Sequence, residues 1–115
     1  MTPDPKKLSF RSEKYKAFVR EHPCVTCGNL NSEAHHEPLV KGRGGSSKCP
    51  DSQTIPLCRG CHILRGIEGQ YSFWEARELN PKTIIIDLLC EYVEQFEAID
   101  CKMAIIDFLT ERIVN

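Results

Sequence analysis

The apolar positions of the chain alternate between helical and strand-like spacing up to residue 69. An apolar face repeating at helical intervals predicts a short helix over residues 12–21. Two strands are predicted over residues 33–40 and 54–57, followed by a short helix over residues 59–65 that Gly66 ends. The order strand, strand, helix indicates a small α+β core.

After residue 69 the pattern becomes wholly helical. Ser72 is the predicted N-cap of a short helix, and the pair Asn80-Pro81 is typical of a helix start. From there on, seven apolar residues follow at alternating spacings of four and three: Ile85, Leu89, Tyr92, Phe96, Ile99, Met103 and Ile106. One long helix could form a homodimer, whereas a helical hairpin would pack on the core. Further apolar residues widen the seam and favour packing on the core, with self-association still open.

Composition and charge fit one domain with an uneven distribution of charge. The 115 residues include 41% apolar and 27% charged ones, as in ordinary globular proteins. No apolar run reaches the roughly 20 residues that span a bilayer, and the N-terminus lacks a secretory signal, so we expect a cytoplasmic protein without membrane contact. Residues 1–66 carry a net charge of +5 and residues 67–115 one of −6. The basic half is the candidate surface for a polyanion.

Four of the seven cysteines form two Cys-x-x-Cys pairs: Cys24, Cys27, Cys58 and Cys61. In a reducing compartment such pairs favour a metal over disulfides, and four thiolates complete a tetrahedral zinc site. The 30 residues between the pairs exceed the usual spacing, so a functional segment is inserted there. Cys49 is a weaker candidate ligand because it has no paired neighbour.

Histidines gather beside these cysteines. His35 and His36 lie in the inserted segment, and His62 follows the last paired cysteine directly. A zinc ion held by four sulfur atoms needs no histidine, but imidazoles serve as metal ligands and as general bases near neutral pH. The sequence therefore indicates an enzyme rather than a simple zinc finger. His22 has no predicted role.

Basic side chains flank the histidines on a glycine-rich loop and on the helix that follows. They could clamp DNA phosphates without reading bases, although a solvated loop is the alternative. The residues are Lys41, Arg43, Lys48, Arg59 and Arg65. Tyr71, Phe73 and Trp74 could stack on bases, but core packing is the favoured interpretation.

The order of these motifs resembles the HNH endonucleases. Cys-x-x-Cys, a histidine pair, a glycine-rich loop and the string IPLCRGCH cover residues 24–65. The strings KCPDSQTIPLC and SFW are similar to a subgroup found in phage and prophage genomes, which suggests a bacterial source. The resemblance implies an α+β fold with a ββα-metal (HNH) core at 24–66, held by structural zinc. A mainly helical arm (1–23) and extension (67–115) would complete a single domain (1–115).

The resemblance also implies roles for individual residues. His36 matches the general base, and His35 and His62 match the ligands of a catalytic divalent cation. Gln53 stands where the family has an asparagine that orients the base, and Asp51 is the competing candidate for that role. Neighbouring residues on a regular strand point to opposite faces, so His35 and His36 can face one site only where the strand ends or bulges.

Gly66 stands where relatives often carry a further histidine ligand. Two protein ligands plus water would suit Mg²⁺ or another divalent cation. The function implied is hydrolysis of DNA phosphodiester bonds. The alternative is a non-catalytic zinc-bound DNA-binding or adaptor module, whose acidic helical tail would bind a protein partner.

Overall fold

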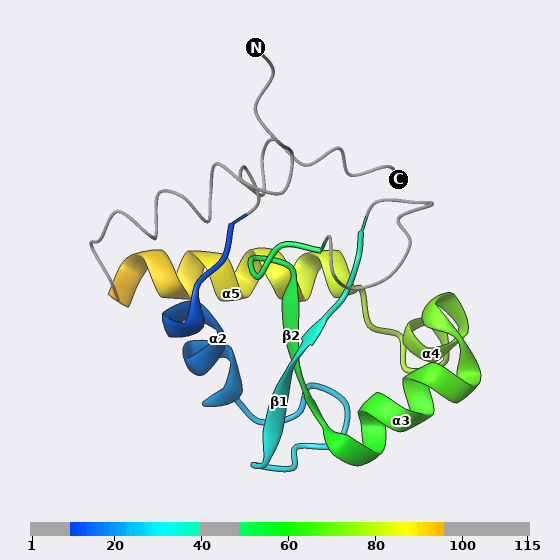
Figure 1. The fold of residues 1–115 in the computed structure, drawn as a ribbon. Coiled ribbons are helices and arrows are strands. Elements are labelled where there is room, and N and C mark those ends of the chain that lie inside the picture. Colours follow the sequence, from blue (N-terminus) through cyan, green and yellow to red (C-terminus); the bar gives the residue numbers. More distant parts are fainter. Residues whose placement is uncertain (1–9, 40–48, 96–115) are drawn as a thin grey trace.

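The computed structural model describes residues 10–39 and 49–95. They form a small mixed α/β structure with a two-stranded sheet and four helices (Figure 1). In chain order the elements are α2 (Glu13–Arg20), β1 (Ser32–His36), β2 (Thr54–Cys58), α3 (Arg59–Glu68), α4 (Gln70–Ala76) and α5 (Pro81–Gln95).

The two strands form the centre of the structure. They pair antiparallel, with His35 opposite Ile55 and His36 opposite Thr54. All five residues of β2 are buried, because α2 and α5 pack against this strand while α3 leaves directly from its end. In Figure 1, α2 and the α3–α4 pair lie on opposite sides of the strands. Because α3 begins directly after β2, its first turn lies beside the paired strand β1.

Helix α2 begins and ends as the pattern predicts. The Ser12 side chain accepts a hydrogen bond from the Tyr15 amide at 3.0 Å, and Tyr15, Phe18 and Val19 are buried. The chain then turns through the first cysteine pair. Gly28 adopts a φ of 80°, which a residue with a side chain rarely adopts, and its amide donates to the Cys24 carbonyl at 2.9 Å. The predicted cysteine turn is therefore present.

Three predicted boundaries are wrong by a few residues. Helix α3 continues through Gly66 to Glu68 and ends at Gly69, whose φ of 95° breaks the helix. A single glycine inside a helix costs only about 1 kcal/mol, so Gly66 does not end α3. Helix α4 begins at Gln70, which places Ser72 inside it rather than at its cap. Strand β1 ends at His36, short of the predicted residue 40.

The beginning of the apolar C-terminal seam packs on the core. Ile85, Leu88, Leu89 and Tyr92 of α5 are buried, and the Tyr92 ring meets Tyr15 of α2 at 4.8 Å between centroids. This confirms the predicted packing for the part of the tail up to residue 95. The rest of the seam lies outside the described residues, so the homodimer stays a prediction.

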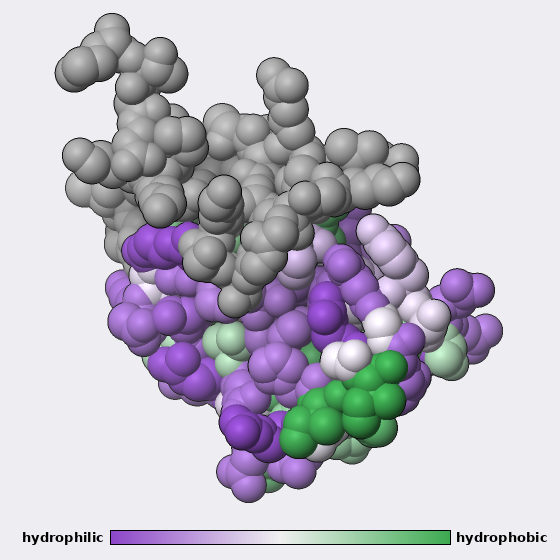
Figure 2. All heavy atoms as spheres, turned by 45° about the vertical axis from the view of Figure 1, so that its right-hand side comes forward, coloured by the Kyte–Doolittle hydropathy of each residue, from purple (hydrophilic) through white to green (hydrophobic). Residues whose placement is uncertain are grey.

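Helix α3 separates a polar face from an apolar one. His62 and Arg65 line a pocket, whereas Ile63, Leu64 and Ile67 are exposed. Figure 2 shows a hydrophobic patch on the molecular face that carries α3 and α4. Among the described residues, no helix is long and apolar enough to cross a membrane.

Candidate functional site

The four paired cysteines converge on one point. The sulfur atoms of Cys24, Cys27, Cys58 and Cys61 all lie within 4.8 Å of one another, and Cys27 and Cys58 are 3.6 Å apart. Four sulfurs at about 2.3 Å from a tetrahedral ion stand about 3.8 Å from one another, so this cluster could hold a metal such as zinc. Burial and the neighbouring sulfurs raise the pKa of the Cys61 thiol to about 12, whereas the burial of Cys24 is outweighed by its hydrogen bonds, which lower its pKa to about 6. Cys24 therefore ionises first, and a cation would favour ionisation of the others.

A second cluster joins β1 to the first turn of α3. His35 Nδ1 and His62 Nε2 are 3.0 Å apart, with ring centroids at 4.4 Å. The outer nitrogen of each ring meets a carboxylate: His35 Nε2 lies 3.0 Å from Glu37, and His62 Nδ1 lies 3.0 Å from Glu33. Burial lowers the pKa of His35, and this outweighs the opposing effect of Glu37, so the neutral imidazole is favoured. These two histidines are therefore arranged as a pair.

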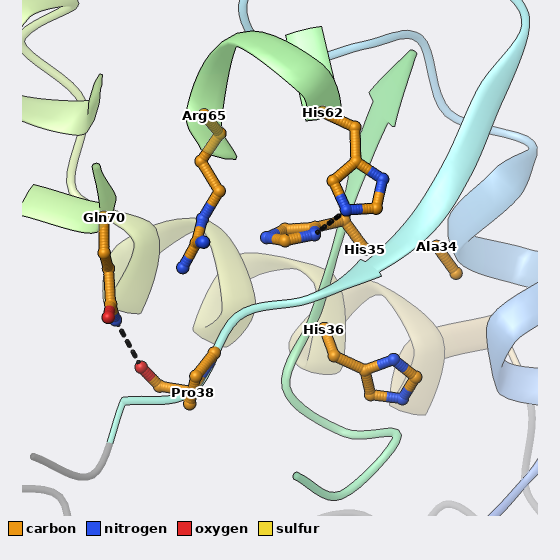
Figure 3. Close-up of a pocket in the computed structure, with 7 residues that line it drawn as sticks. All are labelled: Ala34, His35, His36, Pro38, His62, Arg65 and Gln70. Carbon is orange, nitrogen blue, oxygen red and sulfur yellow. Dashed lines mark hydrogen bonds between the residues drawn. The ribbon is translucent and has the colours of Figure 1, made fainter. Parts of the chain in front are cut away.

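His36 lies on the other side of β1, as a regular strand requires (Figure 3). Its Nε2 lies 2.8 Å from Asp51 Oδ1, and the other oxygen of Asp51 accepts a hydrogen bond from the Ser12 amide at 2.8 Å. Burial raises the pKa of Asp51, but the hydrogen bonds from His36 and Ser12 outweigh it and leave the pKa below its ordinary value. Asp51 is thus an ionised acceptor that fixes the His36 ring.

His35 and His62 line a pocket of about 400 Å³, and His36 borders the same pocket from the other face of β1. The strand neither ends nor bulges between His35 and His36, so their rings do not face one point as the resemblance implied. The pocket walls come from β1, the segment after β1, α3 and the start of α4, through Ala34, His35, His36, Pro38, His62, Arg65 and Gln70 (Figure 3). The His62 side chain is 44% exposed and that of His36 23%, whereas His35 is 6% exposed. The pocket therefore combines a buried histidine with two that solutes can reach.

Comparison with known proteins places the chain in a family. Residues 2–89 match the family model described as "Protein of unknown function (DUF968)". The chain belongs to the DUF968 family. It is similar to the "Uncharacterized protein YdfU" of Escherichia coli (strain K12), with 37% identity over 59 residues. That match spans 50% of the chain but 17% of the relative. No solved structure matches the chain.

The predicted orienting residue and the predicted DNA-contacting residues of this DUF968 protein differ in burial and in hydrogen-bond partners. Gln53 is fully buried, and its side-chain oxygen accepts a hydrogen bond from the Leu39 amide at 3.3 Å rather than from His36. Arg65 holds Glu37 through two hydrogen bonds of 2.9 Å, and Arg59 is 81% exposed. Lys41, Arg43 and Lys48 lie outside the described residues.

The remaining candidates contribute to packing. Cys49 is buried with its sulfur 3.8 Å from the Gln53 side-chain oxygen, and it is not part of the four-cysteine cluster. Phe73 and Trp74 are buried against each other, which confirms the expectation of core packing, whereas Tyr71 is 69% exposed.

Sequence reasoning assigned no role to Glu33 and Glu37, although both contact candidate ligands. The signal that could have found them is the alternation Glu-x-His-x-Glu at residues 33–37. On a strand, alternate residues share one face, so both carboxylates accompany His35 while His36 points away. The partner of Glu33, His62, comes from α3, and the spacing in the sequence could not place it there.

Proposed function

We propose that this DUF968 protein is a metal-dependent endonuclease of the HNH type that hydrolyses DNA phosphodiester bonds. One observation carries the proposal: His35 and His62 present two ring nitrogens 3.0 Å apart in a pocket that His36 also lines. The pairing of a strand residue with a helix residue beside a four-cysteine cluster supports the ββα-metal arrangement.

His35 and His62 fit the ligand pair of a divalent cation. Two nitrogens at about 2.1 Å from an octahedral ion, in neighbouring positions, are separated by about 3.0 Å. The ion would supply charge stabilisation to the phosphoryl oxygens. Imidazole donors suit Ni²⁺ or Zn²⁺ better than Mg²⁺, which prefers oxygen ligands.

His36 is the proposed general base. Asp51 is ionised and can only accept a hydrogen bond, so the proton of His36 resides on Nε2. His36 Nδ1 has no partner among residues 10–39 and 49–95, which leaves its lone pair free to take a proton from an attacking water molecule. In this proposal Asp51, rather than Gln53, is the positioning residue.

The four cysteines would bind structural zinc next to this site. Cys58 and Cys61 bracket the junction of β2 and α3, and His62 follows Cys61 directly. A closed zinc site at the junction would fix the start of α3 and with it the position of His62. Arg59, exposed on the same turn, could contact a DNA phosphate.

Plasmid nicking tests the proposal. Zinc-loaded protein is incubated with supercoiled plasmid, with and without added Mn²⁺, Ni²⁺ or Mg²⁺. We expect cation-dependent nicking that His36→Ala abolishes. The matched control is His22→Ala, because His22 bonds to the Phe18 carbonyl and to Glu91, away from the pocket.

Two outcomes would contradict the proposal. Nicking by His36→Ala at the wild-type rate would exclude this residue as the base. Binding of plasmid without cleavage by any of the cations would instead favour the non-catalytic DNA-binding or adaptor module.

A further inference from the structure

We propose that Glu33 and Glu37 are positioning residues that determine which nitrogen each ligand histidine presents to the cation. His35 would bind through Nδ1 and His62 through Nε2, with the protons held on the outer nitrogens. This inference rests on the proposed function, because it assumes a cation between the two rings.

Glu37 fixes His35 from inside the protein. Its carboxylate is fully buried and receives two hydrogen bonds of 2.9 Å from Arg65, one to each oxygen. This bidentate pairing keeps Glu37 ionised, and an ionised carboxylate only accepts hydrogen bonds. The contact of 3.0 Å with His35 Nε2 therefore requires the proton on Nε2, and the lone pair of Nδ1 faces His62.

Glu33 plays the corresponding part for His62 at the surface. It is 40% exposed, lies 3.0 Å from His62 Nδ1 and pairs loosely with Arg59 at 3.4 Å. As an acceptor it holds the proton on Nδ1, so the lone pair of His62 Nε2 faces His35. Each histidine is thus oriented by a carboxylate, the arrangement that fixes tautomers at metal sites.

The consequence is a pair of lone pairs that face each other across 3.0 Å. Two acceptors at this distance repel unless a metal ion, or a proton shared as a hydrogen bond, lies between them, so the carboxylates prepare the pair for a cation. The charges of the two glutamates and the two arginines, Arg59 and Arg65, cancel. The charge of a bound ion would therefore stay available to a phosphate group.

The test measures the metal site without relying on cleavage. Protein with one equivalent of Zn²⁺ in the cysteine cluster is titrated calorimetrically with Ni²⁺. We expect Glu33→Gln to weaken Ni²⁺ binding about 10- to 100-fold, the usual effect of removing an outer partner of a ligand histidine. The matched control is Glu68→Gln. Glu68 lies at the end of α3, outside the pocket, and pairs with Arg77 at the end of α4, so this change also removes one carboxylate charge from a Glu–Arg pair. The Ni²⁺ affinity of Glu68→Gln should equal that of the wild type.

A spectroscopic measurement identifies the ligand atoms directly. In protein labelled with ¹⁵N at histidine and saturated with Zn²⁺ at both sites, His35 should carry its proton on Nε2 and His62 on Nδ1. Glu37→Gln is avoided, because it would leave Arg65 without its buried partner and could prevent folding.

The possible failures are distinguishable. If the wild type binds no second ion, both the proposed function and this inference are refuted. If the wild type binds a second ion but Glu33→Gln binds it equally well, or the ligand nitrogens are reversed, only this inference is refuted.

Discussion

Replacing Asp51 by asparagine probes the proposed base most sharply, because the substitution conserves shape and removes one acceptor. In the native protein Oδ1 meets His36 at 2.8 Å and Arg11 at 3.4 Å, while Oδ2 accepts from the Ser12 amide at 2.8 Å. An asparagine has one oxygen and one NH₂ group, so it cannot accept on both sides.

The neighbours of residue 51 determine whether the asparagine directs its oxygen or its NH₂ group toward His36. With its oxygen toward His36, the NH₂ group would face the Ser12 amide, and this partly buried donor would lose its acceptor at a cost of up to about 1–3 kcal/mol. With its oxygen toward Ser12, the NH₂ group donates to His36 Nε2, and only the long contact with Arg11 is lost. The second orientation is therefore favoured, and it moves the proton of His36 to Nδ1.

We expect Asp51→Asn to lose most of its nicking activity while keeping most of its stability. Urea unfolding should show that Asp51→Asn loses less than about 1.5 kcal/mol, the net value of one ordinary hydrogen bond. The single-turnover rate of plasmid nicking should fall about 100- to 10,000-fold, the usual contribution of a general base. His36→Ala sets the floor of the assay. If Asp51→Asn nicks at the wild-type rate while His36→Ala is inactive, the orienting role of Asp51 is refuted.

Two further predictions concern the metal sites. Cys58→Ser should lower the zinc content measured by mass spectrometry and reduce the helical circular dichroism signal, because structural zinc contributes about 10 kcal/mol or more to folding. Cys49 is buried outside the cluster, so the control Cys49→Ser should retain its zinc. Equal zinc content in the two variants would refute the cluster. Gly66→His should tighten Ni²⁺ binding, because residue 66 follows His62 by one helical turn and a Cβ added there meets no atom within 4 Å. Gly66→Ala is its control and should raise the free energy of unfolding by about 0.5–1 kcal/mol without changing Ni²⁺ affinity; equal Ni²⁺ affinity of the two variants would contradict the placement of His62.

Local features of the fold were readable from the sequence because their causes are local. Ser12 caps α2 with its own side chain, and the Asn80 side chain accepts from the Lys82 amide at the start of α5. The spacing of Cys24 and Cys27 is that of one metal-binding turn. Boundaries at Gly66 and Ser72 were mistaken, since packing outweighs propensities of about 1 kcal/mol.

In the candidate site too, some features could be predicted from the sequence and others depend on the packing of distant segments. Its histidines were found from their residue type and their position beside the cysteine pairs. Residue type and position could not show that Asp51, rather than Gln53, contacts His36. The loop before β2 buries Gln53 against Leu39 and turns Asp51 toward His36, and both outcomes depend on contacts between distant segments.

By itself, the sequence determined the elements, the two cysteine pairs and the set of candidate histidines, because caps, turns and spacing act over a few residues. Only the tertiary structure decided which atoms meet: the four sulfurs, the pairing of His35 with His62, and the separate partner of His36. The physical reason is that these contacts join segments 15 to 37 residues apart, whose approach depends on the shared core and on the register of the sheet.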